Sequence, residues 1–340
     1  MRTAPRAPAT RSGMTLIELL LVMGILAVML GMGLGTFASL NPGERAAVGL
    51  VQNALRTAHN TAIARSAPAR VRLDRATGRL VTTGALVIGT WHFEDREYRG
   101  VDGMDGVLVG WDEALVQDGY MGRALSFAHA PQGARVEVPV EADPAYDFRQ
   151  GFFIELALRP DEHSSAQLLK VGDAFEARVT SDGGVSATFY QRTLDAAQEA
   201  RRGGAVSVES GPGLLHAGRW TVLRFLYDRR SFRILADGVQ VAATYTDVAV
   251  WDIRSPLVLG GGTRPLQGAL DALVIAVFSG EERAILPGGV LFTEDCPPVV
   301  EFVAGGALDP AVHSGPVTIG LEFADGRRED ILVGLYGTVE

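Results

Sequence analysis

Ser12-Gly13-Met14-Thr15-Leu16-Ile17-Glu18 is the stretch that sets the expected fold, because a long apolar run follows it directly. From Leu19 to Leu40 the chain has 22 residues without an ionisable side chain. A helix rises about 1.5 Å per residue, so this run is long enough to cross a bilayer core of about 30 Å. Arg2, Arg6 and Arg11 precede it without an intervening acid, which predicts that the amino end stays in the cytoplasm.

Glu18 is the one acid at the start of this run. A carboxylate inside a membrane helix costs roughly 2.5 to 3.5 kcal/mol near the bilayer centre, so a partner is expected. Gly13 followed by Met-Thr-Leu-Ile-Glu and a hydrophobic helix resembles the class III leader of type IV pilins and type II secretion pseudopilins. The resemblance implies that prepilin peptidase cleaves between Gly13 and Met14 and that the new Met14 amine is methylated. It also implies that Glu18 pairs with the terminal amine of a neighbouring pilin or pseudopilin during assembly.

Two other interpretations of this region are an ordinary secretory signal and a plain anchor. A secretory signal has an apolar core of about 7–15 residues with its cleavage site after it, whereas here the run is longer and Gly13 lies before it. A plain anchor would gain nothing from Glu18. The sequence therefore predicts a single-pass protein of the bacterial inner membrane, with its C-terminal domains periplasmic or extracellular.

The segment after the apolar run reads as a second, amphipathic helix from about Pro42 to Arg65, since its apolar residues recur at spacings of three and four. A hairpin of Ala69–Leu73 and Arg79–Thr83 is expected next. This passage resembles the helix and first hairpin of H-type minor pseudopilins, and the alternating strand from Val317 to Phe323, with the one from Ile331 to Val339, resembles their last hairpin.

Between these two passages, short alternating strands at intervals of about ten residues predict a β-sandwich. The order of its phrases, from "WHFED" at Trp91 to "LQGALDALVIAVFSGEE" ending at Glu282, resembles a laminin-G-like, concanavalin-A-like jelly roll. The expected fold is therefore α+β and pilin-like, a long N-terminal helix packed on a small antiparallel sheet, with an inserted all-β jelly-roll sandwich. The expected divisions are leader 1–13, transmembrane helix 14–40, pilin helix and first hairpin 41–87, sandwich 88–285 and C-terminal part of the pilin β-domain 286–340.

Composition narrows the range of functions. The formal net charge of −9 over 340 residues argues against a nucleic-acid partner, which needs a basic patch. Cys296 is the sole cysteine, so no intrachain disulfide forms. Glu141-Ala142-Asp143-Pro144 is the nearest approach to a glycosidase carboxylate pair, but it lacks a second glutamate, and we expect no enzyme.

Calcium is the only cofactor with any support in the sequence. Asp102 and Asp105 lie in a glycine loop, and hard oxygen ligands suit that ion. Two turn-forming aspartates are the alternative interpretation.

Together these patterns predict a minor pseudopilin or pilin-like subunit of a type II secretion or type IV pilus-like filament. Its sandwich would bind a glycan or a secreted protein. The alternative is a membrane-anchored surface adhesin or carbohydrate-binding protein that is not assembled into a filament. A lectin-like module should show a rim of exposed aromatic and acidic residues, and a protein-binding module one extended apolar patch.

Overall fold

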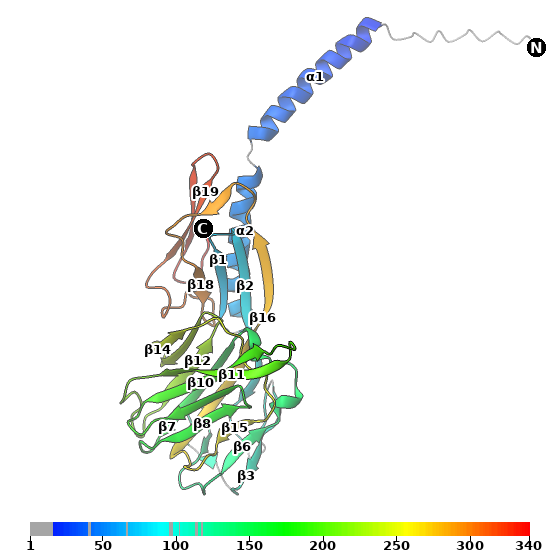
Figure 1. The fold of residues 1–340 in the computed structure, drawn as a ribbon. Coiled ribbons are helices and arrows are strands. Elements are labelled where there is room, and N and C mark those ends of the chain that lie inside the picture. The colour runs from blue at the N-terminus through cyan, green and yellow to red at the C-terminus, as the bar shows by residue number, and fades with distance from the viewer. Residues whose placement is uncertain are drawn as a thin grey trace, which may run out of the picture.

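The computed structural model describes residues 16–39, 42–65, 67–94, 98–101, 103–112, 115–116 and 118–340. Side chains are described for all of these except 31–39, 42, 115–116 and 279–281. Two helices, α1 (Leu16–Ser39) and α2 (Pro42–Ala64), come before all the strands. Figure 1 shows the β-sandwich at the end of the molecule opposite α1, with α2 between them.

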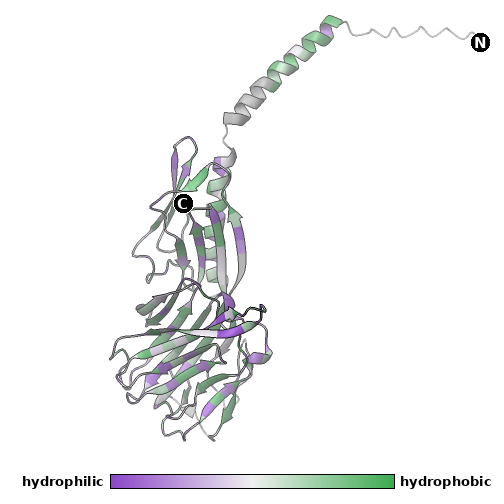
Figure 2. Ribbon diagram, viewed as in Figure 1, coloured by the Kyte–Doolittle hydropathy of each residue, from purple (hydrophilic) through white to green (hydrophobic). Residues whose placement is uncertain are grey.

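Helix α1 carries exposed side chains from Leu16 to Leu30, and these residues are mostly hydrophobic (Figure 2). Within the residues that the structure describes, no helix is long and apolar enough to cross a membrane. The transmembrane helix and the single-pass inner-membrane localisation predicted from the sequence are thereby contradicted.

The largest sheet has ten strands and runs the length of the molecule. Two short strands, β4 (Leu115–Val116) and β5 (Ala124–Ser126), lie off its main path. The main path consists, in spatial order, of β14 (Val239–Tyr245), β13 (Ser231–Ala236), β12 (Thr221–Tyr227), β7 (Phe152–Pro160), β16 (Gly268–Ile285), β2 (Arg79–Trp91), β1 (Ala69–Asp74) and β18 (Val299–Phe302).

A second sheet of seven strands packs on the lower half of the first. Its order is β11 (Ala200–Glu209), β10 (Val185–Leu194), β9 (Phe175–Val179), β8 (Ala166–Val171), β15 (Leu257–Gly260), β6 (Arg135–Val138) and β3 (Val107–Val109). Aromatic rings fill the space between the sheets. Phe152 of β7 lies 5.0 Å from Phe175 of β9, and Phe189 of β10 lies 4.4 Å from Tyr227 of β12, ring centroid to ring centroid. This is a β-sandwich, as the alternating pattern predicts.

Two 3-10 helices, η1 (Val140–Ala142) and η2 (Phe148–Gln150), connect strands of the sandwich. A separate three-stranded sheet, β17 (Val290–Phe292), β19 (Val317–Phe323) and β20 (Arg328–Val333), lies beside α2. The buried face of α2 packs on β1, β18 and this small sheet in one apolar cluster. That face consists of Ala47, Val51, Ala54, Leu55, Ala58 and Ala62, the residues that the helical spacing places together.

The pilin-like α+β fold class predicted from the sequence is wrong. The hairpin of β1 and β2 expected under α2 does not belong to a separate small sheet, because β2 pairs with β16, across two register shifts, from Trp91 opposite Leu273 to Arg79 opposite Ile285. The same two strands therefore lie beside α2 at one end and form part of the sandwich at the other. Apart from α1, α2 and the two short 3-10 helices, the described chain is built from strands and loops, and it is mainly a β-sandwich.

One face of the ten-stranded sheet lies outside both cores. On this outer face Phe153, Leu226 and Phe278 form a small apolar cluster with Leu235 and Ala276. Ala311, from the segment that follows β18, packs against this cluster and covers part of it. The cavities described below open on the uncovered parts of this face and along its edge.

Candidate functional site

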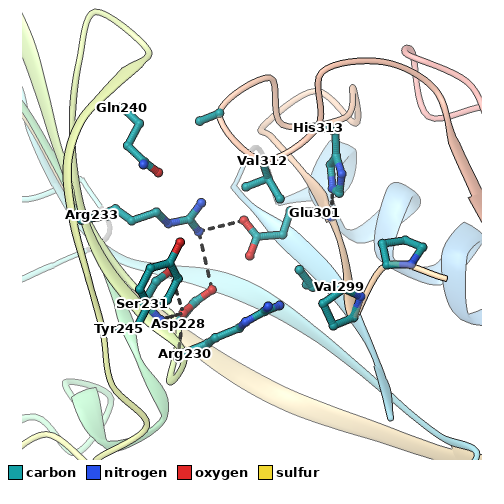
Figure 3. Close-up of a pocket in the computed structure, with 14 residues that line it drawn as sticks. Asp228, Arg230, Ser231, Arg233, Gln240, Tyr245, Val299, Glu301, Val312 and His313 are labelled. Atoms are coloured by element: carbon teal, nitrogen blue, oxygen red, sulfur yellow. Dashed lines mark hydrogen bonds and ion pairs between the residues drawn. The ribbon is translucent and has the colours of Figure 1, made fainter. Parts of the chain in front are cut away.

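A pocket of about 300 Å³ lies where the sandwich meets the C-terminal segment (Figure 3). Strands β13 and β14 form one wall, and β18 with residues 311–313 forms the other. Asp228, Arg233 and Glu301 point into the space between these walls. We call it the junction pocket.

Buried charges dominate the junction pocket. Arg233 Nη2 lies 2.8 Å from Glu301 Oε2 and 3.5 Å from Asp228 Oδ2. Arg70 of β1 reaches the same carboxylate from the other side, with its Nη1 3.3 Å from Asp228 Oδ2. All four side chains are at most 8% exposed, so each charge depends on its neighbours rather than on water.

The pKa values of these groups follow from that crowding. Burial alone would raise the pKa of Asp228, but the Arg70 and Arg233 guanidinium groups hold it down at about 2. Burial raises the pKa of Glu301, and Arg233 offsets only part of that effect. Burial lowers the pKa of Arg70 to about 10. The network connects β1, the β12–β13 turn and β18, and its positive and negative charges largely neutralise one another.

His313 completes the wall of the junction pocket. Its Nε2 accepts a hydrogen bond from the Glu301 backbone N–H at 3.0 Å, which requires an unprotonated nitrogen. Burial lowers the pKa of His313, in keeping with the neutral ring. The imidazole therefore holds the β18 backbone in place.

A larger cleft of about 520 Å³ opens at the other end of the outer face, over β7, β12 and β16. We call it the sandwich cleft. Its lining combines aromatic, acidic and basic groups: His92, Tyr120, Met121, Glu155, Ala157, Val222, Arg224, Asp237, Gly238, Ala272 and Val274. Such a mixture of apolar surface and a few oriented polar groups is typical of small-ligand sites.

Tyr120 is the exposed aromatic ring of the sandwich cleft, with 47% of its surface accessible. Its ring centroid lies 6.1 Å from that of Trp220 in an edge-to-face arrangement. The Arg159 guanidinium lies 5.2 Å from the Trp220 ring centroid and also donates to the Asp118 carbonyl at 3.0 Å. These contacts fix the Tyr120 loop against the sheet.

Asp271 anchors the same loop from below. Its side chain is fully buried in β16, and it accepts hydrogen bonds from the backbone N–H groups of Met121 at 2.8 Å and Ala272 at 2.7 Å. Burial raises the pKa of Asp271. Asp271 therefore belongs to the framework of the cleft.

Polar groups on the floor of the sandwich cleft are oriented by the strands. Arg224 of β12 donates to Glu155 Oε2 of β7 through Nη2 at 2.6 Å and through Nε at 2.8 Å. Its guanidinium lies 5.0 Å from the Phe153 ring centroid. Both members of this pair are about one quarter exposed. Because both bonds use Oε2, Glu155 Oε1 makes neither of them.

Most residues singled out in the sequence lie elsewhere. Gly13, Met14 and Asp102 are outside the described residues. Glu18 lies in α1 with an exposed side chain, and Asp105 is exposed, its Oδ1 accepting from the Gly100 backbone N–H at 3.2 Å. Their roles in processing, assembly and calcium binding stay predictions. Among the described residues no group of three or more His, Cys, Asp or Glu side chains could hold a metal ion.

The four tryptophans do not form one sugar platform. Trp91 and Trp251 are buried, while Trp111 is half-buried and packs near Phe127. Trp220 lies beside the sandwich cleft, through its contact with Tyr120. The sequence did not single out Tyr120, because nothing in the local pattern of this loop marks an exposed aromatic residue.

No protein-family model matches the chain, and no curated protein sequence matches it. Solved β-sandwich domains do match. Domain 4 of AbnA, a GH43 extracellular arabinanase from Geobacillus stearothermophilus, in complex with arabinotriose, is 14% identical, with 58% of this chain and 94% of that chain covered and a TM-score of 0.40. The CBM40 of Ruminococcus gnavus IT-sialidase bound to α2,3-sialyllactose is 13% identical, with 45% and 88% covered and a TM-score of 0.32.

A third match is the binding domain of botulinum neurotoxin DC in complex with SialylT. It is 6% identical, with 72% of this chain and 73% of that chain covered and a TM-score of 0.43. The described fold, which is mainly a β-sandwich, contradicts the pilin and pseudopilin resemblance of the N-terminal region. The expected pilin and peptidase partners have no support.

Proposed function

We propose that this chain is a carbohydrate-binding protein and that the sandwich cleft receives the saccharide. The observation that carries the proposal is the exposed Tyr120 ring beside the Glu155–Arg224 pair and Asp237. A sugar offers an apolar C–H face to an aromatic ring and hydroxyl groups to carboxylates and guanidinium groups. The volume of about 520 Å³ lies within the usual range for small-ligand sites.

The rim of the sandwich cleft favours a glycan over a protein ligand. A protein-binding module is expected to present one extended apolar patch. Here the single exposed ring, Tyr120, is combined with Glu155 of β7, Arg224 of β12 and Asp237 of the β13–β14 turn. The chain is proposed to bind its ligand without chemical change.

A glycan array followed by isothermal titration calorimetry tests this proposal. The ligand should bind the wild type and bind Tyr120→Ala at least about ten-fold more weakly, because a central aromatic contact is lost. Tyr120→Phe should retain most of the affinity. Tyr336→Ala is the matched control, since Tyr336 is 83% exposed and lies outside the sandwich cleft.

Equal affinity of Tyr120→Ala and Tyr336→Ala for the array ligand would exclude the sandwich cleft as its site. Failure to bind any saccharide on the array would overturn the function itself. Incubation of the best ligand with the protein, followed by mass spectrometry, checks that the saccharide leaves unchanged. Melting with calcium chloride and with EDTA separately tests the calcium site predicted at Asp102 and Asp105.

A further inference from the structure

A third cavity, of about 420 Å³, lies beside the β1–β2 hairpin and under the β12–β13 turn. We call it the arginine groove. Its lining consists of Arg72, Leu73, Asp74, Arg79, Val81, Arg229, Arg230 and Pro298. Arg230 and Pro298 also line the junction pocket, so the two cavities are neighbours.

The arginine groove has four guanidinium groups and a single carboxylate. Arg72 donates to the main-chain carbonyl of Asp228, and Arg229 Nη1 donates to the carbonyl of Arg149 at 3.2 Å. A carbonyl satisfies donors without neutralising the charge. Within the described residues, none of the four arginines forms an ion pair, and the single carboxylate of the groove, Asp74, which interacts electrostatically with Arg79, offsets only part of their positive charge.

The acids nearest to the arginine groove are already engaged. Asp74 accepts from Thr77 Oγ1 at 2.5 Å and from the Ala76 backbone N–H at 3.0 Å, and these hydrogen bonds help to lower its pKa. The Asp228 carboxylate faces Arg70 and Arg233 in the junction pocket. The groove is thus a local cationic site on a chain whose formal net charge is −9. Such a local reversal of charge favours capture of an anion.

We propose that the arginine groove binds an acidic saccharide through a sulfate or carboxylate group. The planar guanidinium fork matches the paired oxygens of both anions. Val81 and the exposed Pro298 add apolar surface on which a sugar ring can rest. Only the saccharide part of the ligand rests on the function proposed above. Anion recognition rests on the arginines alone.

Calorimetry with three probes tests the arginine groove: a 6-sulfated hexose disaccharide, its unsulfated parent and inorganic sulfate. The sulfated disaccharide should bind most tightly, and its affinity should fall as salt is raised. The double variant Arg79→Gln/Arg230→Gln should weaken it by at least about ten-fold, because two charge-assisted contacts are removed. The matched control Arg178→Gln/Arg264→Gln removes two exposed arginines outside the groove and should leave affinity unchanged.

Three outcomes would overturn this inference. The first is that the sulfated disaccharide binds no more tightly than its parent, and the second is that it binds equally well to both double variants. The third is that inorganic sulfate binds as tightly as the sulfated disaccharide, which would show an adventitious ion only. Thermal melting of both double variants checks that they are folded. Tyr120 lies outside the arginine groove. Loss of binding in Tyr120→Ala therefore reports on the sandwich cleft, and loss of binding in Arg79→Gln/Arg230→Gln reports on the arginine groove.

Discussion

The sandwich core and the junction hold the same ten-stranded sheet by opposite means. In the sandwich core, Phe152 and Phe225 are completely buried among other aromatic rings. At the junction, Asp228, Arg233 and Glu301 are almost as deeply buried, but as charges. Strand β12 shows the change within a few residues, since Phe225 enters the core and Asp228 directly follows the strand.

Because the two regions are stabilised differently, they should respond differently to substitutions and to pH. Packed rings depend on shape and contact, so a smaller side chain leaves a cavity at any pH. Buried ion pairs depend on every partner being present and ionised, so they respond to single substitutions and to protons. We therefore expect the sandwich core to be sensitive to volume and the junction to be sensitive to charge.

The largest expected effect is in the sandwich core. Phe152 stacks on Phe148 at 4.9 Å and contacts four further rings within about 6 Å, so Phe152→Ala should destabilise the protein by about 4 kcal/mol. Guanidinium chloride unfolding measures this change. The control Leu194→Ala, at a side chain 52% exposed, should change stability by less than about 0.5 kcal/mol. Similar values for both variants would contradict the assignment of this core.

The next effect is at the junction, where Arg233→Met should destabilise by about 3 kcal/mol, because it leaves Asp228 and Glu301 without their shared cation. Adding Glu301→Gln removes one stranded charge and should recover part of the loss. A double-mutant cycle from urea unfolding measures the coupling. Strictly additive losses would show that the pair does not act as a unit.

Acid should weaken the junction before it affects the aromatic core. The pKa of Asp228 lies at about 2 in the folded protein, against an ordinary value of 3.8. The carboxylate therefore contributes about 2 kcal/mol above pH 4, and this contribution is lost as the pH falls toward 2. Unfolding of wild type and Asp228→Asn should differ near pH 6 and converge near pH 2. A difference independent of pH would count against the ion pairs.

The smallest expected effect concerns His313. Its lowered pKa means that its contribution to stability is present above the ordinary value of 6.5 and is lost as the pH falls through the folded value. His313→Ala should cost about 1 kcal/mol at pH 7.5, the usual value of one hydrogen bond. The variant should differ less from wild type at pH 5. Hydrogen exchange of the Glu301 amide reports directly on the bond.

Periodicity correctly predicted the elements whose environment is set by neighbouring residues. The buried face of α2, from Ala47 to Ala62, follows the helical spacing, and the turn-rich middle of the chain is the expected sandwich. The continuation of β2 to Trp91 was missed. Its alternating pattern breaks near Leu86, where Val87 and Gly89 pair with adjacent residues of β16 across a bulge. A bulge reverses the faces, so the sequence alone suggested an end.

The candidate sites were even less accessible to sequence analysis. Arg72 and Arg79 lie some 150 residues from Arg229 and Arg230, and each pair alone looks like an ordinary surface pair. The net charge of −9 therefore predicted no basic patch, whereas the fold gathers all four arginines in one groove. Tyr120 likewise packs against Trp220, and its loop is held by a hydrogen bond to Asp271. Both of these partners are distant in the chain.

The amphipathic α2, the sandwich of short strands and the acidic overall charge can all be predicted from the sequence, because they depend on composition and on short-range periodicity. Only the tertiary structure decided that β2 and β16 join both halves in one sheet. It also determines which charges are buried against one another at the junction and which gather, mostly positive, in the arginine groove. Pairing between distant strands sets these neighbours, and no local pattern encodes them.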